Sequence, residues 1–97
     1  MTPPDPNPAT RQRVRFRPDV LIQQVGGDSV LLNLASDAYF SLDAIGTRML
    51  QVLQESDSVA EAVDRLVEEY EVDRPTLERD MLELAGECAA QGLVEIH

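Results

Sequence analysis

The chain has 97 residues, which suits one domain with a modest hydrophobic core, and it is 43% hydrophobic but only 4% aromatic. Its 18 acidic residues outnumber eight basic residues, all of them arginine, and the formal net charge is −10. This acidity disfavours binding to nucleic-acid phosphates or anionic membranes, and no run approaches the ~20 apolar residues of a membrane span.

The first residues differ in composition from the rest. Residues 1–12 carry four prolines and almost nothing apolar, so we expect a disordered tail before a folded domain over residues 13–97. Four arginines give the first 17 residues a charge of +3: Arg11, Arg13, Arg15 and Arg17. The Pro-rich start is unlike a secretory signal and the single cysteine fits a reducing compartment, so we predict a cytoplasmic protein.

The next part of the chain predicts a small antiparallel sheet. Residues 14–16 alternate apolar and polar side chains and predict a short strand or lead-in, which Pro18 interrupts. Three runs rich in β-formers follow, at residues 20–25, 29–34 and 38–42. Turn residues separate them: "GGD" supplies a glycine for a tight hairpin, and "ASD" makes a second turn. Two tight turns in succession predict a three-stranded meander.

The hydrophobic period then changes from 2 to 3.6, which predicts three helices. Their expected ranges are roughly 44–55, 59–70 and 74–91. Three N-terminal signals mark the starts: Asp43, the capping box Ser58–Glu61, and Asp73 with Pro75 in the first turn. Gly46 lies inside the first helix, where we expect it to allow close approach of the preceding strand. Gly92 is a candidate C-cap, after which "LVEIH" packs back or forms a last short strand.

These elements predict an α+β fold with a three-stranded antiparallel sheet followed by three helices, similar to a winged helix-turn-helix domain. One edge of the strand 38–42 has no predicted neighbour, and an open edge either needs protection or binds something. In the last helix the apolar stripe covers about 160°, wider than one buried face requires. Either two neighbouring elements cover this helix, or one flank of the stripe lines an open groove beside Asp80 and Arg79.

The sequence lacks the residues of a catalytic or metal site, so we expect no enzyme activity, no metal and no cofactor. The only histidine is His97, so a Ser or Cys triad cannot be assembled around a central histidine. Cys88 lies on the apolar side of the last helix and is expected in the core, and with His97 it cannot form a structural zinc site.

Two binding hypotheses remain. The first is a winged-helix DNA-binding regulator, but the last helix has a net charge of −2, whereas a DNA-binding helix normally contacts phosphates with Lys or Arg. The second is peptide binding by strand addition, in which an extended peptide pairs with the free edge of strand 38–42 and directs alternate side chains towards the last helix. The second hypothesis agrees better with the acidic charge.

The ordered set of segments resembles a PqqD-like recognition element of ribosomally synthesised, modified peptide (RiPP) pathways. The resemblance is carried by "VLLNLASDAYFSLDAIGTRMLQVL", "SVAEAVDRLVEEYEVD" and "QGLVEI", and covers residues 18–96. It implies a non-catalytic protein that binds the leader of a precursor peptide and presents it to maturation enzymes. A free-standing domain is similar to those of lasso-peptide pathways, which hand the leader to a protease. The alternative is a peptide chaperone for a radical-SAM enzyme in pyrroloquinoline quinone biosynthesis.

The resemblance also implies a binding site, with the leader added as a strand beside strand 38–42 and against the last helix. It nominates seven residues: Tyr39, Phe40 and Ser41 on the strand, and Leu77, Asp80, Met81 and Leu84 on the helix. The predicted peptide-binding set also includes Ala38 and Arg74. Members of the family often have large apolar residues where this chain has Ala85 and Cys88. We expect a monomer or a weak dimer formed through the edge of strand 38–42.

Overall fold

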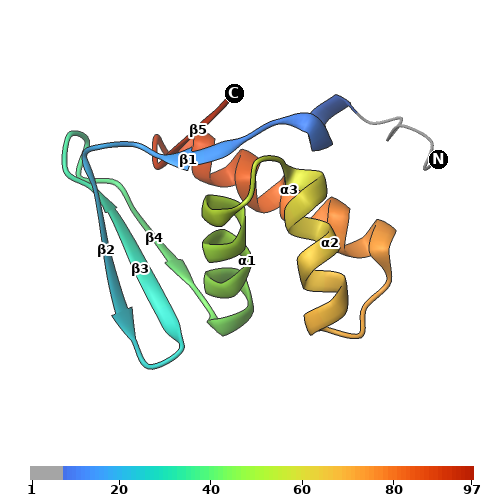
Figure 1. Cartoon of the computed structure of the whole chain (residues 1–97). Coiled ribbons are helices and arrows are strands. Elements are labelled where there is room, and N and C mark those ends of the chain that lie inside the picture. The colour runs from blue at the N-terminus through green and yellow to red at the C-terminus, as the bar shows by residue number, and fades with distance from the viewer. Residues whose placement is uncertain (1–7) are drawn as a thin grey trace.

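A computed structural model describes residues 8–97; residues 1–7, most of the expected tail, lie outside the described part. Figure 1 shows the β2–β3 hairpin at one end, β4 beside α1, and α3 behind α1 and α2. The elements in chain order are η1 (Pro8–Arg11), β1 (Val14–Phe16), β2 (Val20–Val25), β3 (Asp28–Asn33), β4 (Tyr39–Leu42), α1 (Ala44–Glu55), α2 (Val59–Glu69), α3 (Arg74–Ala90) and β5 (Val94–Ile96).

The predicted three-stranded meander is confirmed, and with it the α+β fold of three antiparallel strands followed by three helices. The strand order is β2-β3-β4, so β2 and β4 form the two edges. Gly26 has a φ of 65° in the hairpin between β2 and β3, the positive value for which the sequence supplied a glycine. Strands β3 and β4 each begin one residue from the expected position, at Asp28 and Tyr39.

The first and last strands pair with each other in a second, two-stranded sheet. Phe16 lies opposite Val94 in this antiparallel ladder, so "VRF" is a strand because the end of the chain returns beside it. Before β1, the 3₁₀ helix η1 packs against α2 and α3, and Thr10 is fully buried. The packed part of the chain therefore begins before residue 13, inside the segment expected to be tail.

Each helix begins at the residue that the sequence indicated. The side chains of Asp43, Ser58 and Asp73 accept hydrogen bonds from N–H groups in the first turns of α1, α2 and α3. At the end of α3, the Gly92 N–H donates to the Ala89 carbonyl at 3.0 Å and the Leu93 N–H donates to the Cys88 carbonyl at 2.9 Å. These two bonds form a Schellman motif around Gly92, whose φ is 71°.

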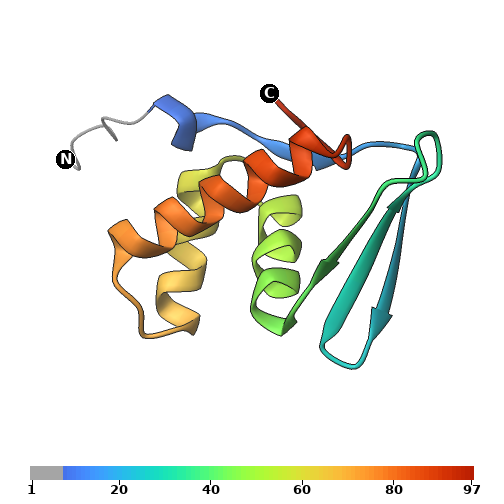
Figure 2. The same cartoon turned by 180° about the vertical axis from the view of Figure 1, so that it is seen from behind.

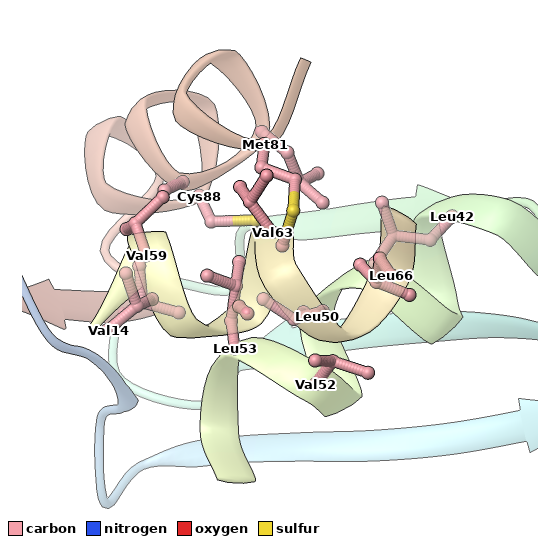
Figure 3. Close-up of a cluster of buried hydrophobic side chains, with 14 of the residues drawn as sticks. Val14, Leu42, Leu50, Val52, Leu53, Val59, Val63, Leu66, Met81 and Cys88 are labelled. Carbon is pink, nitrogen blue, oxygen red and sulfur yellow. The ribbon is translucent and has the colours of Figure 1, made fainter. Parts of the chain in front are cut away.

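Helix α3 is central, which accounts for most of its broad apolar stripe. It packs against α1, α2, β5 and η1 (Figure 2). Figure 3 shows Met81 and Cys88 of α3 in the same buried cluster as Val59 and Val63 of α2 and Leu53 of α1. On the surface, the Arg48 guanidinium of α1 donates to both carboxylate oxygens of Glu69 at the end of α2. This hydrogen bond to Arg48 holds the pKa of Glu69 below its ordinary value.

Within residues 8–97, no helix is both long enough and apolar enough to cross a membrane.

Candidate functional site

Strand β4 presents an open edge whose backbone groups can be assigned from the register. The Asn33 N–H donates to the Ala38 carbonyl at 2.8 Å, which makes these opposed residues a hydrogen-bonded pair. Hydrogen-bonded and non-hydrogen-bonded pairs alternate along an antiparallel ladder, so Phe40 and Leu42 also direct their backbone groups towards β3. Tyr39 and Ser41 therefore direct their N–H and C=O groups away from the sheet, at the edge where no other strand of residues 8–97 pairs.

The side chains of β4 alternate as the sequence predicted. Leu42 is 8% exposed in the core, and Phe40 is half-buried against that core. Tyr39 is 71% exposed and Ser41 is also exposed, so both point away from the helices. The strand is therefore held to the molecule by Phe40 and Leu42, while its other face remains accessible.

A groove lies between β4, the first turns of α1 and the C-terminal half of α3. Its volume is about 510 Å³. The lining is largely apolar, with a carboxylate on the α1 side and another on the α3 side. The lining residues are Phe40, Ser41, Leu42, Asp43, Ile45, Gly46, Met49, Leu84 and Glu87. A peptide paired with the open edge of β4 would lie along this groove, with alternate side chains directed to its apolar floor.

Gly46 brings α1 close to β4 at one end of the groove. A Cβ at this position would lie 3.2 Å from Leu42 Cδ2 and 3.3 Å from Asp43 Oδ1. Asp43 is held in the same turn, because its Oδ1 accepts the Gly46 N–H at 2.8 Å. The close approach inferred from the sequence is therefore confirmed, and it makes the chain turn sharply from strand into helix beside the groove.

Asn33 fixes the other end of β4 relative to α3. Its side-chain Nδ2 donates to the Gly92 carbonyl at 2.9 Å, and its Oδ1 accepts from the Ala35 N–H at 2.9 Å. The side chain is largely buried. This residue therefore joins the turn before β4 to the end of α3, a role that sequence reasoning missed. An asparagine immediately before a turn was the available signal, because its side chain readily bonds to turn backbone.

The structure divides the predicted helix residues between core and groove. Leu77 and Met81 are 4% and 0% exposed, so both belong to the core, whereas Leu84 lines the groove at the edge of that core. Arg74 forms an ion pair with Asp64 of α2.

Three other predicted residues do not line the groove: Ala38, Tyr39 and Asp80. Asp80 is half-buried and lies 3.8 Å from Arg79, measured between Oδ1 and Nε. On the strand side, Phe40 and Ser41 line the groove, whereas Tyr39 and the half-buried Ala38 lie beyond it. Six lining residues were not predicted: Leu42, Asp43, Ile45, Gly46, Met49 and Glu87. Three of them belong to α1, and the apolar stripe of the last helix carries no information about which α1 residues lie opposite it.

The other sequence features have structural explanations. In the region that the structure describes, no group of His, Cys, Asp or Glu side chains is arranged to hold a metal ion. Burial raises the pKa of the Cys88 thiol to about 11, which makes it a poor nucleophile at neutral pH. The Arg15 guanidinium donates to the Leu53 and Ser56 carbonyls and so caps the C-terminal end of α1.

Comparison with known proteins places the chain in a family. Residues 28–94 match the model of coenzyme PQQ synthesis protein D (PqqD). The chain belongs to the PqqD family. This confirms the resemblance seen in the sequence, and the match spans β3 to the beginning of β5, including every residue that lines the groove.

Two solved structures share the fold over nearly their whole length. The first, described as TbiB1 in complex with the TbiA(beta) leader peptide, is 37% identical, with a TM-score of 0.77 and coverage of 84% of this chain and 94% of TbiB1. The second is a lasso peptide synthetase B1 complexed with the leader peptide, 30% identical, with a TM-score of 0.77 and coverage of 86% and 98%. No curated protein sequence matches the chain.

Proposed function

We propose that this PqqD-family chain binds the leader of a ribosomally made precursor peptide by strand addition to β4. The observation that carries the proposal is the open edge of β4 at the side of an apolar groove. Two relatives of the same fold and 30–37% identity are complexes with leader peptides, which supports the same class of ligand here. The chain acts without catalysis: it holds the leader in an extended form and delivers it to a maturation enzyme.

The geometry supports a moderate affinity. The outward N–H and C=O groups of Tyr39 and Ser41 offer about four backbone hydrogen bonds, each contributing ~1 kcal/mol. About three apolar side chains on the groove floor contribute ~2 kcal/mol each. From this gross ~10 kcal/mol, ordering the peptide removes roughly 2–5 kcal/mol and association removes more. At most about 5–8 kcal/mol remains before the association cost, so we expect a Kd no tighter than the micromolar range for these contacts alone, and tighter binding only where the leader makes further contacts in the groove.

The enzyme that receives the leader is proposed from the relatives. One structural relative is a lasso peptide synthetase B1, so a leader protease of a lasso pathway is the favoured partner. The family model is described as a coenzyme PQQ synthesis protein, which supports a radical-SAM partner as the second candidate. A DNA-binding role is disfavoured, because the side chains of α3 have a net charge of −2 and Arg74 is engaged by Asp64.

The test is amide hydrogen exchange of the protein with and without peptide. The probes are a synthetic leader of the precursor encoded beside this chain's gene and the TbiA(beta) leader peptide. We expect saturable 1:1 binding of the neighbouring leader and slower exchange of the Tyr39 and Ser41 amides. The outward amides of Ile22 and Gln24, on the opposite edge at β2, serve as the internal control and keep their rates. Saturable binding without protection on β4, or no binding of either peptide, would contradict the proposal.

The Tyr39 side chain provides a second test. It is the most exposed large hydrophobic side chain of β4, at 71%. Because this side chain is exposed, Tyr39→Ala should leave the urea midpoint almost unchanged. It should weaken leader binding, because a peptide strand paired with β4 places a side chain beside Tyr39 on the same face. Unchanged affinity for both peptides would show that the Tyr39 side chain does not contribute to binding. The backbone pairing is tested separately, by the amide hydrogen exchange of β4.

A further inference from the structure

The α3 side of the groove carries a carboxylate without a partner. Glu87 lines the groove one turn after Leu84, and its side chain is exposed. Among residues 8–97, no ion pair or side-chain hydrogen bond engages this carboxylate. The carboxylate on the α1 side belongs to Asp43 and already accepts the Gly46 N–H. Glu87 is therefore the acidic group of the groove that remains available to a ligand.

The surrounding part of α3 strengthens this negative charge. Asp80 and Glu87 are seven residues apart, which places them within about 20° of each other on the helix circumference. The two arginines of α3 lie near its start and have acidic neighbours: Arg74 pairs with Asp64, and Arg79 lies beside Asp80. From residue 80 to residue 90 the helix contains no basic side chain. Arg79 therefore offsets part of the charge of Asp80, whereas no basic residue of the helix lies within seven positions of Glu87.

Because Glu87 lies beside an apolar floor, its charge discriminates between basic and acidic side chains of a ligand. Leu84 is 9% exposed and Met49 is half-buried, so an occupied groove excludes water from one side of the Glu87 carboxylate. Partial exclusion of water strengthens a charge pair relative to one on open surface. An acidic ligand side chain at the same place would meet like charge and lose hydration, which discriminates against it.

We propose that the peptide strand bound beside β4 carries a Lys or Arg whose cationic group pairs with Glu87, and that this pair selects among otherwise similar apolar strands. The inference rests on the proposed function, because it assigns a specificity residue to the same groove. Glu87 binds the positive charge of the ligand. The apolar side chains fill the floor, and the backbone of β4 fixes the register.

Selection from a displayed library of random 12-residue peptides tests the proposal without a known ligand. The protein, its Glu87→Lys variant and its Glu68→Lys variant are each used as bait. Glu68 is exposed on α2 and does not line the groove, so its variant has the same change in net charge as Glu87→Lys. We expect the protein and Glu68→Lys to enrich Lys or Arg at one fixed distance from the apolar positions. Glu87→Lys should enrich Asp or Glu there.

Affinity measurements with one selected peptide then give the contribution of Glu87 to binding. Glu87→Gln should weaken its binding about three- to tenfold, and the same loss should follow when the basic residue of the peptide is replaced by Gln. Combining the two changes should add little further loss, because both remove the same pair. This coupling is the readout that a merely structural role of Glu87 would not produce.

Two results would count against the proposal, and they are distinguishable. If peptides with regularly spaced apolar residues are enriched but no basic position is fixed, or if Glu87→Lys enriches the same peptides, the role of Glu87 is wrong and leader binding stands. If no peptide is enriched on the unmodified protein, and the neighbouring leader also fails to protect the β4 amides, the proposed function itself is wrong.

Discussion

A proline at Ser41 isolates the backbone contribution of the open edge. The Ser41 N–H faces away from β3, so its removal leaves the bonds between β3 and β4 in place. In a strand-addition complex, this N–H would donate to a carbonyl of the peptide. Ser41→Pro leaves that carbonyl buried without a donor, which costs ~1–3 kcal/mol, or about 5- to 150-fold in affinity.

The matched control is a proline on the opposite edge. Gln24 lies on β2 and also directs its N–H away from the sheet, so Gln24→Pro has the same local chemistry at an edge that does not line the groove. Proline fixes φ near −65°, which imposes a similar strain on either strand. We expect both variants to remain folded, with comparable urea midpoints, and only Ser41→Pro to lose affinity for the leader.

The assay is fluorescence anisotropy with a labelled leader, together with urea unfolding of each variant. A third variant, Phe40→Pro, calibrates the unfolding measurement, because the Phe40 N–H faces β3 and its loss breaks the ladder. We expect this variant to be the least stable of the three. Unchanged affinity of a folded Ser41→Pro protein, or equal losses for Ser41→Pro and Gln24→Pro, would refute strand addition at β4.

Three further predictions concern the fold that holds the groove. The pKa of the Cys88 thiol is raised from 9.0 to about 11 by burial, so the wild-type protein should lose stability relative to Cys88→Ala as pH rises from about 9 to 11, and urea titrations at both pH values measure this. Gly92→Ala should destabilise by ~1–3 kcal/mol in urea, because φ is 71° and the new Cβ would lie 2.8 Å from Asn33 Nδ2. The bond to Arg48 lowers the pKa of Glu69, so its stabilisation is lost as pH falls through the acid range; Glu69→Gln should show a shallower acid dependence of the thermal midpoint.

Local signals explain why so much of the fold was predictable. Asp43, Ser58 and Asp73 act on the helix turn that follows them, and Gly26 and Gly92 act through their own φ values. Such preferences depend on a few neighbouring residues, so the sequence reports them directly. The pairing of β1 with β5 was less predictable, because it joins segments from opposite ends of the chain and depends on how the helices place them.

The composition of the groove was predicted only in part, for a geometric reason. A helical wheel identifies the apolar side of α3 but not which neighbouring element covers each residue. Leu77, Met81 and Leu84 lie within about 60° of one another on the wheel, yet the first two are 4% and 0% exposed in the core, and only Leu84 lines the groove. Ile45 and Met49 enter the groove because Gly46 brings α1 against β4, a contact that sequence spacing alone does not specify.

The acidity of the chain and the open edge of β4 are complementary features of one surface. An exposed edge strand invites pairing between identical chains, and natural proteins limit this with short strands and charge. Here β4 has four residues, and the groove beside it carries Asp43 and Glu87 on a chain of net charge −10. Two copies that approach edge to edge bring these carboxylates together, whereas a peptide with a basic side chain brings the opposite charge. The charge that disfavours self-pairing thus favours a basic ligand, so raising the salt concentration should weaken leader binding while strengthening any weak dimer.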